Sequence, residues 1–295
     1  MALSFGISPA LVTPFSREGV DVKRLLAHAQ SCLDRGCPTA TLFGTTGEGP
    51  SVSAKERDRV AAEMVGAGMP PGRLVEAVLA CSVEEAVFGT RRALRRGARA
   101  VLLAPPFYFR PVPDEGVFAW YAEVFRAVGP DLRDVILYHI PGMTGVPLSH
   151  ALVARLVDTF PGAVLGVKDS ACDADATLAL IEAFPGLDIL VGDESYLGRA
   201  CAAGAAGSIC GVANLEPEAV IALAENGRDD SRVVALVRAI TAHPVIPMVK
   251  ALVAHVRGDR AWAQARPPLP TIGEDEARAV AQLLEPFRQP AESRA

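Results

Sequence analysis

The sequence lacks both an excess of positive charge and long hydrophobic runs, and each absence excludes a class of protein. Its 295 residues include 29 Lys and Arg against 34 Asp and Glu, a formal net charge of −5. A nucleic-acid-binding surface needs a basic patch to offset phosphate charge, so we expect no nucleic-acid partner. A membrane-spanning helix needs about 20 consecutive apolar residues. Charged residues or glycine break the apolar runs earlier, so we expect no membrane partner.

Cysteine is also scarce. The six cysteines are scattered along the chain, and no two of them have the C-x-x-C spacing of a zinc site. They are Cys32, Cys37, Cys81, Cys172, Cys201 and Cys210. We interpret them as reduced, buried thiols, and we expect neither a structural metal nor a cofactor. Residues 1–6 show no basic segment and no apolar core of a signal peptide, which favours a cytoplasmic location.

The sequence does contain a repeated alternation of short apolar stretches with amphipathic segments. The expected strands are 7–12, 39–42, 74–80, 99–104, 134–138, 163–168, 188–191 and 207–211. Helical patterns lie between them, and Ser53 with Glu56 and Ser82 with Glu85 are spaced as capping boxes. Strands that alternate with helices form a parallel sheet. Eight such units predict an α/β fold, the (β/α)8 TIM barrel, since the rival doubly wound sheet lacks its G-x-G-x-x-G fingerprint.

The alternation ends after Gly227. Residues 231–256 and 274–287 have helical patterns, and a proline-rich breaker at 266–270 separates them. We therefore expect a catalytic barrel over residues 1–227 and a C-terminal helical appendage over residues 228–295. No low-complexity linker joins the two parts, which indicates that they move as one body.

In a barrel of this kind the chemistry lies at the carboxyl ends of the strands. Lys168 ends the apolar stretch 163–168, where a solvated lysine is not expected. Burial without a carboxylate partner favours the neutral amine, which can attack a carbonyl and form a Schiff base. The alternative is a lysine that reaches solvent or pairs with a nearby acid such as Asp169. Position alone leaves both interpretations open.

Two further strand ends carry polar residues. Tyr138 is either a proton carrier or a core aromatic with a satisfied hydroxyl. Thr45 and Thr46 are flanked by glycines, and the N–H groups of such a turn can hold a carboxylate, although a purely structural turn is the more frequent explanation. Glu48, which follows, is either a helix-dipole partner or a buried structural acid.

The five histidines show no metal-ligand spacing, and we assign them no role. His28 is expected on the solvent side of its helix. Strand alternation turns His139 away from the side that Tyr138 faces.

Taken together, the strand-end motifs resemble those of the dihydrodipicolinate synthase / N-acetylneuraminate lyase family of class I aldolases. The main motifs are Gly44-Thr45-Thr46-Gly47-Glu48, Tyr138-His139-Ile140-Pro141 and Gly166-Val167-Lys168-Asp169-Ser170. Weaker matches lie at 12–15, 106–108, 192–193 and 207–214. All of them occur in the family's order along most of the chain.

The resemblance implies a mechanism and a set of site residues. Lys168 would form the imine with the 2-oxo carbon of pyruvate, and Tyr138 would transfer protons through the Thr45 hydroxyl to Tyr108. The Thr45–Thr46 turn would bind the pyruvate carboxylate. The remaining substrate contacts would come from Gly44, Gly47, Met143 and Ile209. In the family, the tyrosine matched by Tyr108 crosses from a neighbouring subunit, which implies a homo-oligomer, a dimer or more usually a tetramer.

Two positions depart from the family pattern, and the first bears on the substrate. The synthases that make lysine precursors carry an arginine that clamps the carboxylate of the aldehyde, and this sequence has Met143 there. Methionine offers no bidentate donor. His139 also replaces a frequent asparagine.

We therefore favour a Schiff-base aldolase or lyase that condenses pyruvate with an aldehyde or cleaves a 2-oxo acid of the 2-oxo-3-deoxy sugar acid type. The first alternative is 4-hydroxy-tetrahydrodipicolinate (dihydrodipicolinate) synthase. A dehydratase or hydratase-aldolase that uses the same lysine is a further alternative. A non-catalytic barrel that binds an oxo acid is the last, and it would not need Lys168, Tyr138 and Thr45 together.

Overall fold

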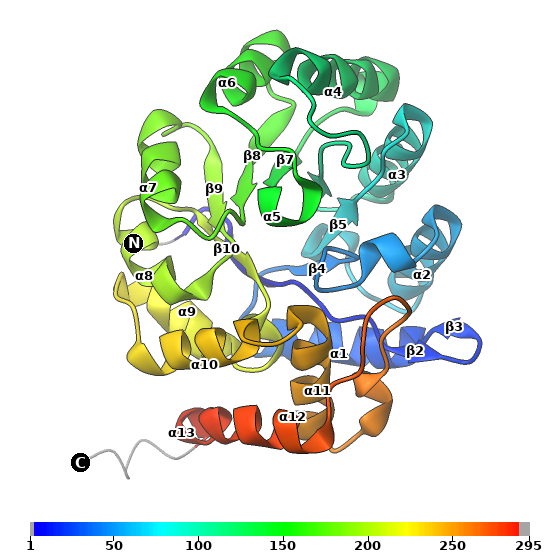
Figure 1. The fold of residues 1–295 in the computed structure, drawn as a ribbon. Helices are drawn as coiled ribbons and strands as arrows, with labels where there is room; N and C mark the ends of the chain where they lie inside the picture. Colours follow the sequence, from blue (N-terminus) through cyan, green and yellow to red (C-terminus); the bar gives the residue numbers. More distant parts are fainter. Residues whose placement is uncertain (1–2, 289–295) are drawn as a thin grey trace.

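A computed structural model describes residues 3–288 and shows eight parallel strands arranged as a barrel (Figure 1). Neighbouring strands follow one another around the ring, and a bridge between Ala10 and Thr41 joins its two edges. The predicted (β/α)8 TIM barrel is therefore confirmed. The strands are β1 (Gly6–Pro9), β4 (Ala40–Leu42), β5 (Leu74–Val78), β6 (Ala100–Leu103), β7 (Val135–His139), β8 (Val164–Asp169), β9 (Asp188–Val191) and β10 (Gly207–Cys210).

Helices surround the barrel as an outer ring (Figure 1). They are α1 (Val22–Asp34), α2 (Ala54–Gly66), α3 (Val83–Arg96), α4 (Asp114–Val128), α6 (His150–Thr159), α7 (Ala174–Ala183), α8 (Leu197–Ala202) and α9 (Pro217–Asn226). Short 3₁₀ turns lie at Gly49–Ser51, Pro71–Arg73, Gly129–Asp131, Glu194–Tyr196 and Val212–Asn214. Two small elements were not foreseen, the hairpin of β2 (Phe15–Ser16) and β3 (Gly19–Val20) and the short helix α5 (Pro141–Thr144).

The expected capping boxes are half correct. The Ser53 and Ser82 side chains each accept a hydrogen bond of 3.2 Å from the backbone N–H three residues later. The Glu56 and Glu85 carboxylates do not accept hydrogen bonds from the backbone N–H groups of these serines, because each pairs with an arginine instead. Arg266 binds Glu56, and Arg57 binds Glu85. Arginine–carboxylate pairs are stronger than a bond to a neutral N–H, so the long-range contact prevails.

The barrel interior is filled by side chains and forms a floor beneath the strand ends. This interior cluster is separate from the larger core between sheet and helices, and it includes Val75, Ala77, Ala100, Leu102, Ile136, Tyr138, Leu190 and Ile209. A Cβ atom at Gly166 would lie 1.9 Å from the carbonyl oxygen of Asp188. Only glycine therefore lets β8 and β9 approach so closely next to Lys168.

Helices also follow the barrel, but residues 231–256 do not form the single helical segment that their pattern indicates. They form α10 (Ser231–Thr241) and α11 (Val245–Arg257), and the chain bends by 118° between them. Pro244 lies at the break, and proline cannot donate the N–H that would continue a helix. The remaining elements are the 3₁₀ turn Arg260–Ala263, α12 (Glu274–Ala281), the 3₁₀ turn Gln282–Leu284 and α13 (Glu285–Arg288).

The division into a catalytic part, 1–227, and an appendage, 228–295, stays a prediction, and residues 1–2 and 289–295 lie outside the described residues. Within residues 3–288, no single helix is long and apolar enough to cross a membrane. The bent pair α10–α11 passes that test only when its two helices are counted together.

His28 contradicts the expectation that it faces solvent. Its side chain is buried, and its Nε2 lies 3.0 Å from Oδ1 of Asn214, while Arg257 lies 2.7 Å from its Nδ1. Burial, together with the charge of Arg257, lowers the pKa of His28 to about 4. The side of α1 that the local pattern marks as solvent-facing is covered by Arg257 and Trp262, which lie more than 200 residues later in the chain.

Candidate active site

Lys168 lies at the carboxyl end of β8 with a side chain that is only 4% exposed. Its Nζ donates a hydrogen bond of 3.1 Å to the hydroxyl of Tyr138. Asp169 points to the other side of the strand, where its carboxylate lies 3.0 Å from Nδ1 of His139 and accepts a bond of 2.6 Å from Thr177. The alternative in which Lys168 pairs with Asp169 is therefore wrong, since alternate residues of a strand face opposite sides.

The acid beside Lys168 is held in its charged form. Burial alone would raise the pKa of Asp169, but hydrogen bonds from His139 and Thr177 keep that pKa below its usual value. His139 faces away from the side of Tyr138, as expected. The His139–Asp169 pair joins the ends of β7 and β8, which fixes the positions of Tyr138 and Lys168 on the opposite face.

Tyr138 connects Lys168 to the turn after β4. The tyrosine is 1% exposed, and its hydroxyl lies 3.1 Å from Oγ1 of Thr45. The register of β7 and β8 places Tyr138 directly beside Lys168. The structure therefore contains a continuous polar chain from the amine of Lys168 through Tyr138 to Thr45, along which a proton can move.

The turn of residues 44–48 is fixed by contacts with the segment that follows β1. A Cβ atom at Gly47 would lie 2.7 Å from the backbone oxygen of Leu11, so only glycine fits there. The Thr13 hydroxyl donates a bond of 2.6 Å to the carbonyl of Gly47. Glu48, which ends the turn, has a positive φ of 55°. These constraints fix the backbone that carries Thr45 and Thr46.

Glu48 is the buried structural acid of the two alternatives. Its side chain is fully buried and forms an ion pair with Lys250 of α11, which is also fully buried. The second carboxylate oxygen accepts a bond of 2.8 Å from the backbone N–H of Arg266, and Lys250 donates one of 2.9 Å to the carbonyl of Thr13. Sequence analysis missed Lys250, although a lysine within the apolar run Met248–Ala251 was the signal that could have found it.

Breaking this pair from one side is expected to destabilise the protein. Lys250→Met leaves the Glu48 carboxylate buried without its cation and should lower the free energy of unfolding by about 3–5 kcal/mol. The double variant Glu48→Gln/Lys250→Met removes both charges and should recover much of that loss. Urea unfolding measures both, with Lys55→Met at an exposed lysine as the matched control. Equal losses in the single and double variants would contradict the ion-pair account.

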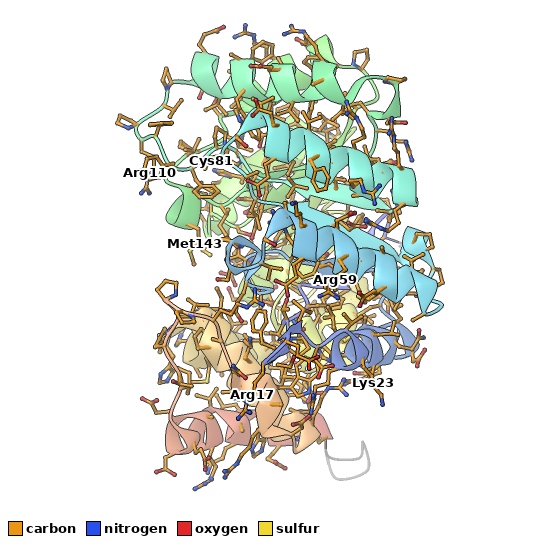
Figure 2. The ribbon with its side chains drawn as sticks, turned by 90° about the vertical axis from the view of Figure 1, so that its right-hand side faces the viewer. Arg17, Lys23, Arg59, Cys81, Arg110 and Met143 are labelled. Carbon is orange, nitrogen blue, oxygen red and sulfur yellow. The ribbon has the colours of Figure 1, made fainter. Side chains whose placement is uncertain are left out.

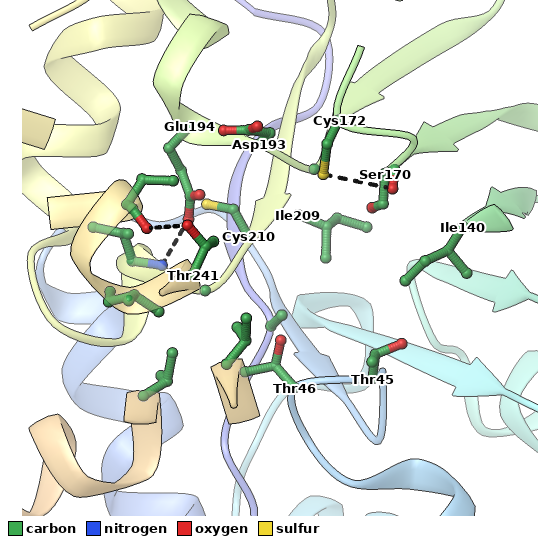
Figure 3. A pocket seen from close by; sticks show the side chains of 18 of the residues that line it. Thr45, Thr46, Ile140, Ser170, Cys172, Asp193, Glu194, Ile209, Cys210 and Thr241 are labelled. Atoms are coloured by element: carbon green, nitrogen blue, oxygen red, sulfur yellow. Dashed lines mark hydrogen bonds between the residues drawn. The ribbon is translucent and has the colours of Figure 1, made fainter. Parts of the chain in front are cut away.

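A cavity of about 270 Å³ opens at the carboxyl ends of the strands, and the buried side chains of Lys168 and Tyr138 are among those that line it. The turn residues Thr45 and Thr46 line one side. Ser170, Cys172, Asp193 and Glu194 line the facing side, as Figure 3 shows, and Ile209 lies between the two. The outer wall comes from α10 and α11.

The structure brings most of the expected site residues together. Lys168, Tyr138, Thr45, Thr46, Met143 and Ile209 all line the cavity, whereas Gly44 and Gly47 shape the turn without lining it. Tyr108 is 76% exposed and packs edge-on against Phe109, outside the cavity of this single chain. Its link to Thr45 is not present within one chain and stays a prediction.

Sequence analysis missed most of the cavity's other residues. Asp193 was noted only as part of a weak motif, and Glu194 was not noted at all. Burial raises the pKa of the Glu194 carboxyl, which accepts a bond of 2.7 Å from the N–H of Val212. The expectation of buried thiols holds for three cysteines, Cys32, Cys37 and Cys210. It is wrong for Cys172, which is exposed at the cavity, and for Cys81 and Cys201, which are half-buried; all six are free.

The arrangement can perform amine-based carbonyl chemistry. Among the residues that the structure describes, no carboxylate lies within ion-pair distance of Lys168, and its hydrogen-bond partner is the Tyr138 hydroxyl. An enclosed amine next to a tyrosine hydroxyl is equipped to attack a carbonyl and to exchange protons with the adduct.

Comparisons with known proteins agree with this chemistry. The model of the dihydrodipicolinate synthetase family matches residues 3–286. A crystal structure of dihydrodipicolinate synthase from Agrobacterium tumefaciens is 44% identical, with a TM-score of 0.93, over 97% of this chain and 100% of that one. A 4-hydroxy-tetrahydrodipicolinate synthase of Synechococcus is 31% identical over 95% of this chain and 94% of its own length. A DapA-like lyase of Chloroflexus aurantiacus is 33% identical over 74% of this chain and 73% of its own length.

The match over nearly the whole chain, the barrel and the buried lysine at the end of β8 agree with one another. The chain belongs to the dihydrodipicolinate synthetase family and is a lyase of the class I aldolase type, which uses a lysine Schiff base.

Proposed function

We propose that Lys168 forms the Schiff base and that the protein joins pyruvate to a neutral aldehyde, or cleaves the corresponding 2-oxo acid. The observation that carries the proposal is the environment of the four lysines in the sequence. Lys23 and Lys55 are exposed, and Lys250 is held by Glu48. Lys168 alone is buried at a cavity with a hydroxyl, rather than a carboxylate, as its partner.

The proposed reaction uses the polar chain of Lys168, Tyr138 and Thr45. The amine of Lys168 attacks the 2-oxo carbon of pyruvate, and Tyr138 supplies the proton with which the carbonyl oxygen leaves as water. The protonated imine withdraws electrons, so the methyl group loses a proton and becomes an enamine carbon. That carbon bonds to the aldehyde carbon, the aldehyde oxygen takes a proton, and water releases the product from Lys168. Thr45 and Thr46 hold the pyruvate carboxylate throughout.

The second substrate is proposed to be uncharged because of what lines the cavity. Met143 lies where an arginine would be needed to clamp a carboxylate. Among the described residues that line the cavity, Lys168 is the single basic side chain. The carboxyl groups of Asp193 and Glu194 lie on the facing wall (Figure 3). A carboxylate on the aldehyde would therefore lose its hydration without gaining a cation.

The test is the use of aspartate semialdehyde, which carries such a carboxylate. We expect its kcat/KM with the unmodified protein to be well below about 10⁴ M⁻¹s⁻¹, an ordinary value for a working enzyme. Met143→Arg should raise kcat/KM by roughly 10- to 100-fold, because a charge-assisted hydrogen bond contributes about 1.5–3 kcal/mol. Met143→Leu is the matched control and should leave it unchanged.

Dihydrodipicolinate synthase activity is the second candidate, and one observation favours it. The side chain of Arg110 packs against Gly145, two residues after Met143, since a Cβ atom there would lie 2.5 Å from its Cδ. Arg110 and Met143 project from the same side of the molecule (Figure 2). If kcat/KM for aspartate semialdehyde is near 10⁴ M⁻¹s⁻¹ or above, this candidate takes first place.

We also propose a homo-oligomer, usually a tetramer in proteins of this kind, in which Tyr108 reaches a neighbouring subunit. The exposed aromatic pair Tyr108–Phe109 supports it, because large apolar side chains in water favour burial against a partner. A fully active enzyme that sediments as a monomer would contradict it. The cytoplasmic location and the absence of a cofactor stay predictions.

A further inference from the structure

We infer that the aldehyde end of the cavity is built for an apolar group, so that the preferred second substrate is an aromatic or branched aliphatic aldehyde rather than a polyhydroxylated one. This inference rests on the proposed function, because it concerns the partner of the pyruvate enamine. It departs from the 2-oxo-3-deoxy sugar acid type of substrate that the sequence favoured.

The first observation is the outer wall of the cavity. Six side chains of α10 and α11 line it. Five are aliphatic, Val237, Ile240, Val245, Ile246 and Val249, and the sixth is Thr241. The bend at Pro244 turns the two helices so that both contribute to this wall. A straight helix over residues 231–256 could not present its two ends to one cavity of this size. This wall therefore offers mainly dispersion contacts and little hydrogen bonding.

The second observation concerns three polar side chains of the cavity, Asp193, Glu194 and Thr241, each of which already has a hydrogen-bond partner within the protein. Asp193 accepts a bond of 2.9 Å from the N–H of Ser195, and Glu194 accepts one of 2.7 Å from Val212. The Thr241 hydroxyl donates a bond of 2.9 Å to the carbonyl of Val237 in its own helix. A chain of substrate hydroxyls would have to compete for these groups or lose its hydrogen bonds to water, which costs free energy.

The third observation is exposure at the mouth. Among the residues that the structure describes, five large hydrophobic side chains are exposed, and two of them, Met143 at 60% and Val245 at 37%, line this cavity. They lie on separate elements, α5 and α11. An apolar group on the substrate would remove the side chains of Met143 and Val245 from water, whereas the hydroxyl groups of a sugar chain would keep them in contact with polar atoms.

The reaction itself is unchanged by this assignment. The enamine carbon derived from the pyruvate methyl group bonds to the aldehyde carbon, and the aldehyde oxygen takes a proton. The product is a 4-hydroxy-2-oxo acid whose C4 substituent is apolar. In the cleavage direction, the same 2-oxo acid yields pyruvate and the apolar aldehyde.

The experiment compares kcat/KM for benzaldehyde and for glyceraldehyde with pyruvate held at saturation in the full-length protein. Both aldehydes are uncharged, so the comparison isolates the distal group. We expect benzaldehyde to be used at least about tenfold better, since one buried methylene alone is worth roughly fourfold. Borohydride trapping of pyruvate on Lys168 is measured in parallel.

Two matched variants complete the test. Val245→Thr replaces a methyl group at the cavity by a hydroxyl of similar shape and should lower kcat/KM for benzaldehyde about 3- to 10-fold, with little change for glyceraldehyde. Val234→Thr makes the same change on α10 at a residue outside the cavity lining and should change neither.

The outcomes separate this inference from the proposed function. Trapping at Lys168 together with glyceraldehyde used as well as benzaldehyde, or better, would overturn the apolar assignment and leave the Schiff-base proposal standing. Equal effects of Val245→Thr on both aldehydes would also overturn it. If no pyruvate is trapped at Lys168, the proposed function fails first and this inference fails with it.

Discussion

Lys168→Ala is expected to abolish turnover, with a loss in kcat of at least about 10⁴-fold. The imine is the electron sink of the proposed reaction, and no other described lysine lines the cavity to replace it. The fold should persist, because the Nζ of Lys168 makes one hydrogen bond, to Tyr138, and the neighbouring Asp169 is satisfied by other groups. Pyruvate release or consumption measures the activity.

Urea unfolding of Lys168→Ala serves as the control for folding, and Lys55→Ala serves as the control for removing a lysine at the surface. A well-folded Lys168→Ala protein that retains more than a few per cent of wild-type kcat would show that the reaction does not pass through this amine.

Tyr138→Phe is expected to lower kcat by roughly 10²- to 10⁴-fold, the usual contribution of a general acid–base group. The substitution removes the hydroxyl that lies between Lys168 and Thr45, while the ring keeps its place in the barrel interior. The KM for pyruvate should change far less, because Lys168 and the Thr45–Thr46 turn remain. Steady-state kinetics with pyruvate and the best aldehyde measure the two effects separately.

A second buried tyrosine provides the matched control. Tyr121 on α4 is fully buried, and its hydroxyl donates a bond of 3.2 Å to the carbonyl of Leu103, outside the cavity lining. Tyr121→Phe should therefore cost stability without lowering kcat. An unchanged kcat in Tyr138→Phe would mean that Tyr138 only packs the core, as most strand tyrosines do.

Sequence reasoning was most successful where the information is local. Each barrel strand is a short apolar run bounded by turn residues, so the eight strands and their order were predictable. The carboxyl ends of parallel strands lie at one face of the barrel. The sequence alone therefore predicts that Lys168, Tyr138 and Thr45 lie close together at that face. The hydrogen bonds that join them confirm that they do converge.

Features that depend on distant segments were not predictable in this way. His28 looks solvent-facing within its own helix, but Arg257 and Trp262 cover it. Glu48 remained ambiguous because its partner, Lys250, is 202 residues away. The bend between α10 and α11, which forms the apolar wall of the cavity, interrupts a continuous helical pattern. The local pattern of apolar residues carries no information about contacts with segments that are distant in the sequence.

Borohydride reduction in the presence of pyruvate, followed by intact mass measurement and peptide mapping, tests the central claim most directly. Reduction converts the imine into a stable secondary amine, so the reacting lysine keeps the mass of the pyruvate skeleton. With four lysines in the chain, the assignment is unambiguous. We predict one adduct per chain, on Lys168, and none on Lys23, Lys55 or Lys250. An adduct on another lysine, or no adduct at saturating pyruvate, would contradict the account.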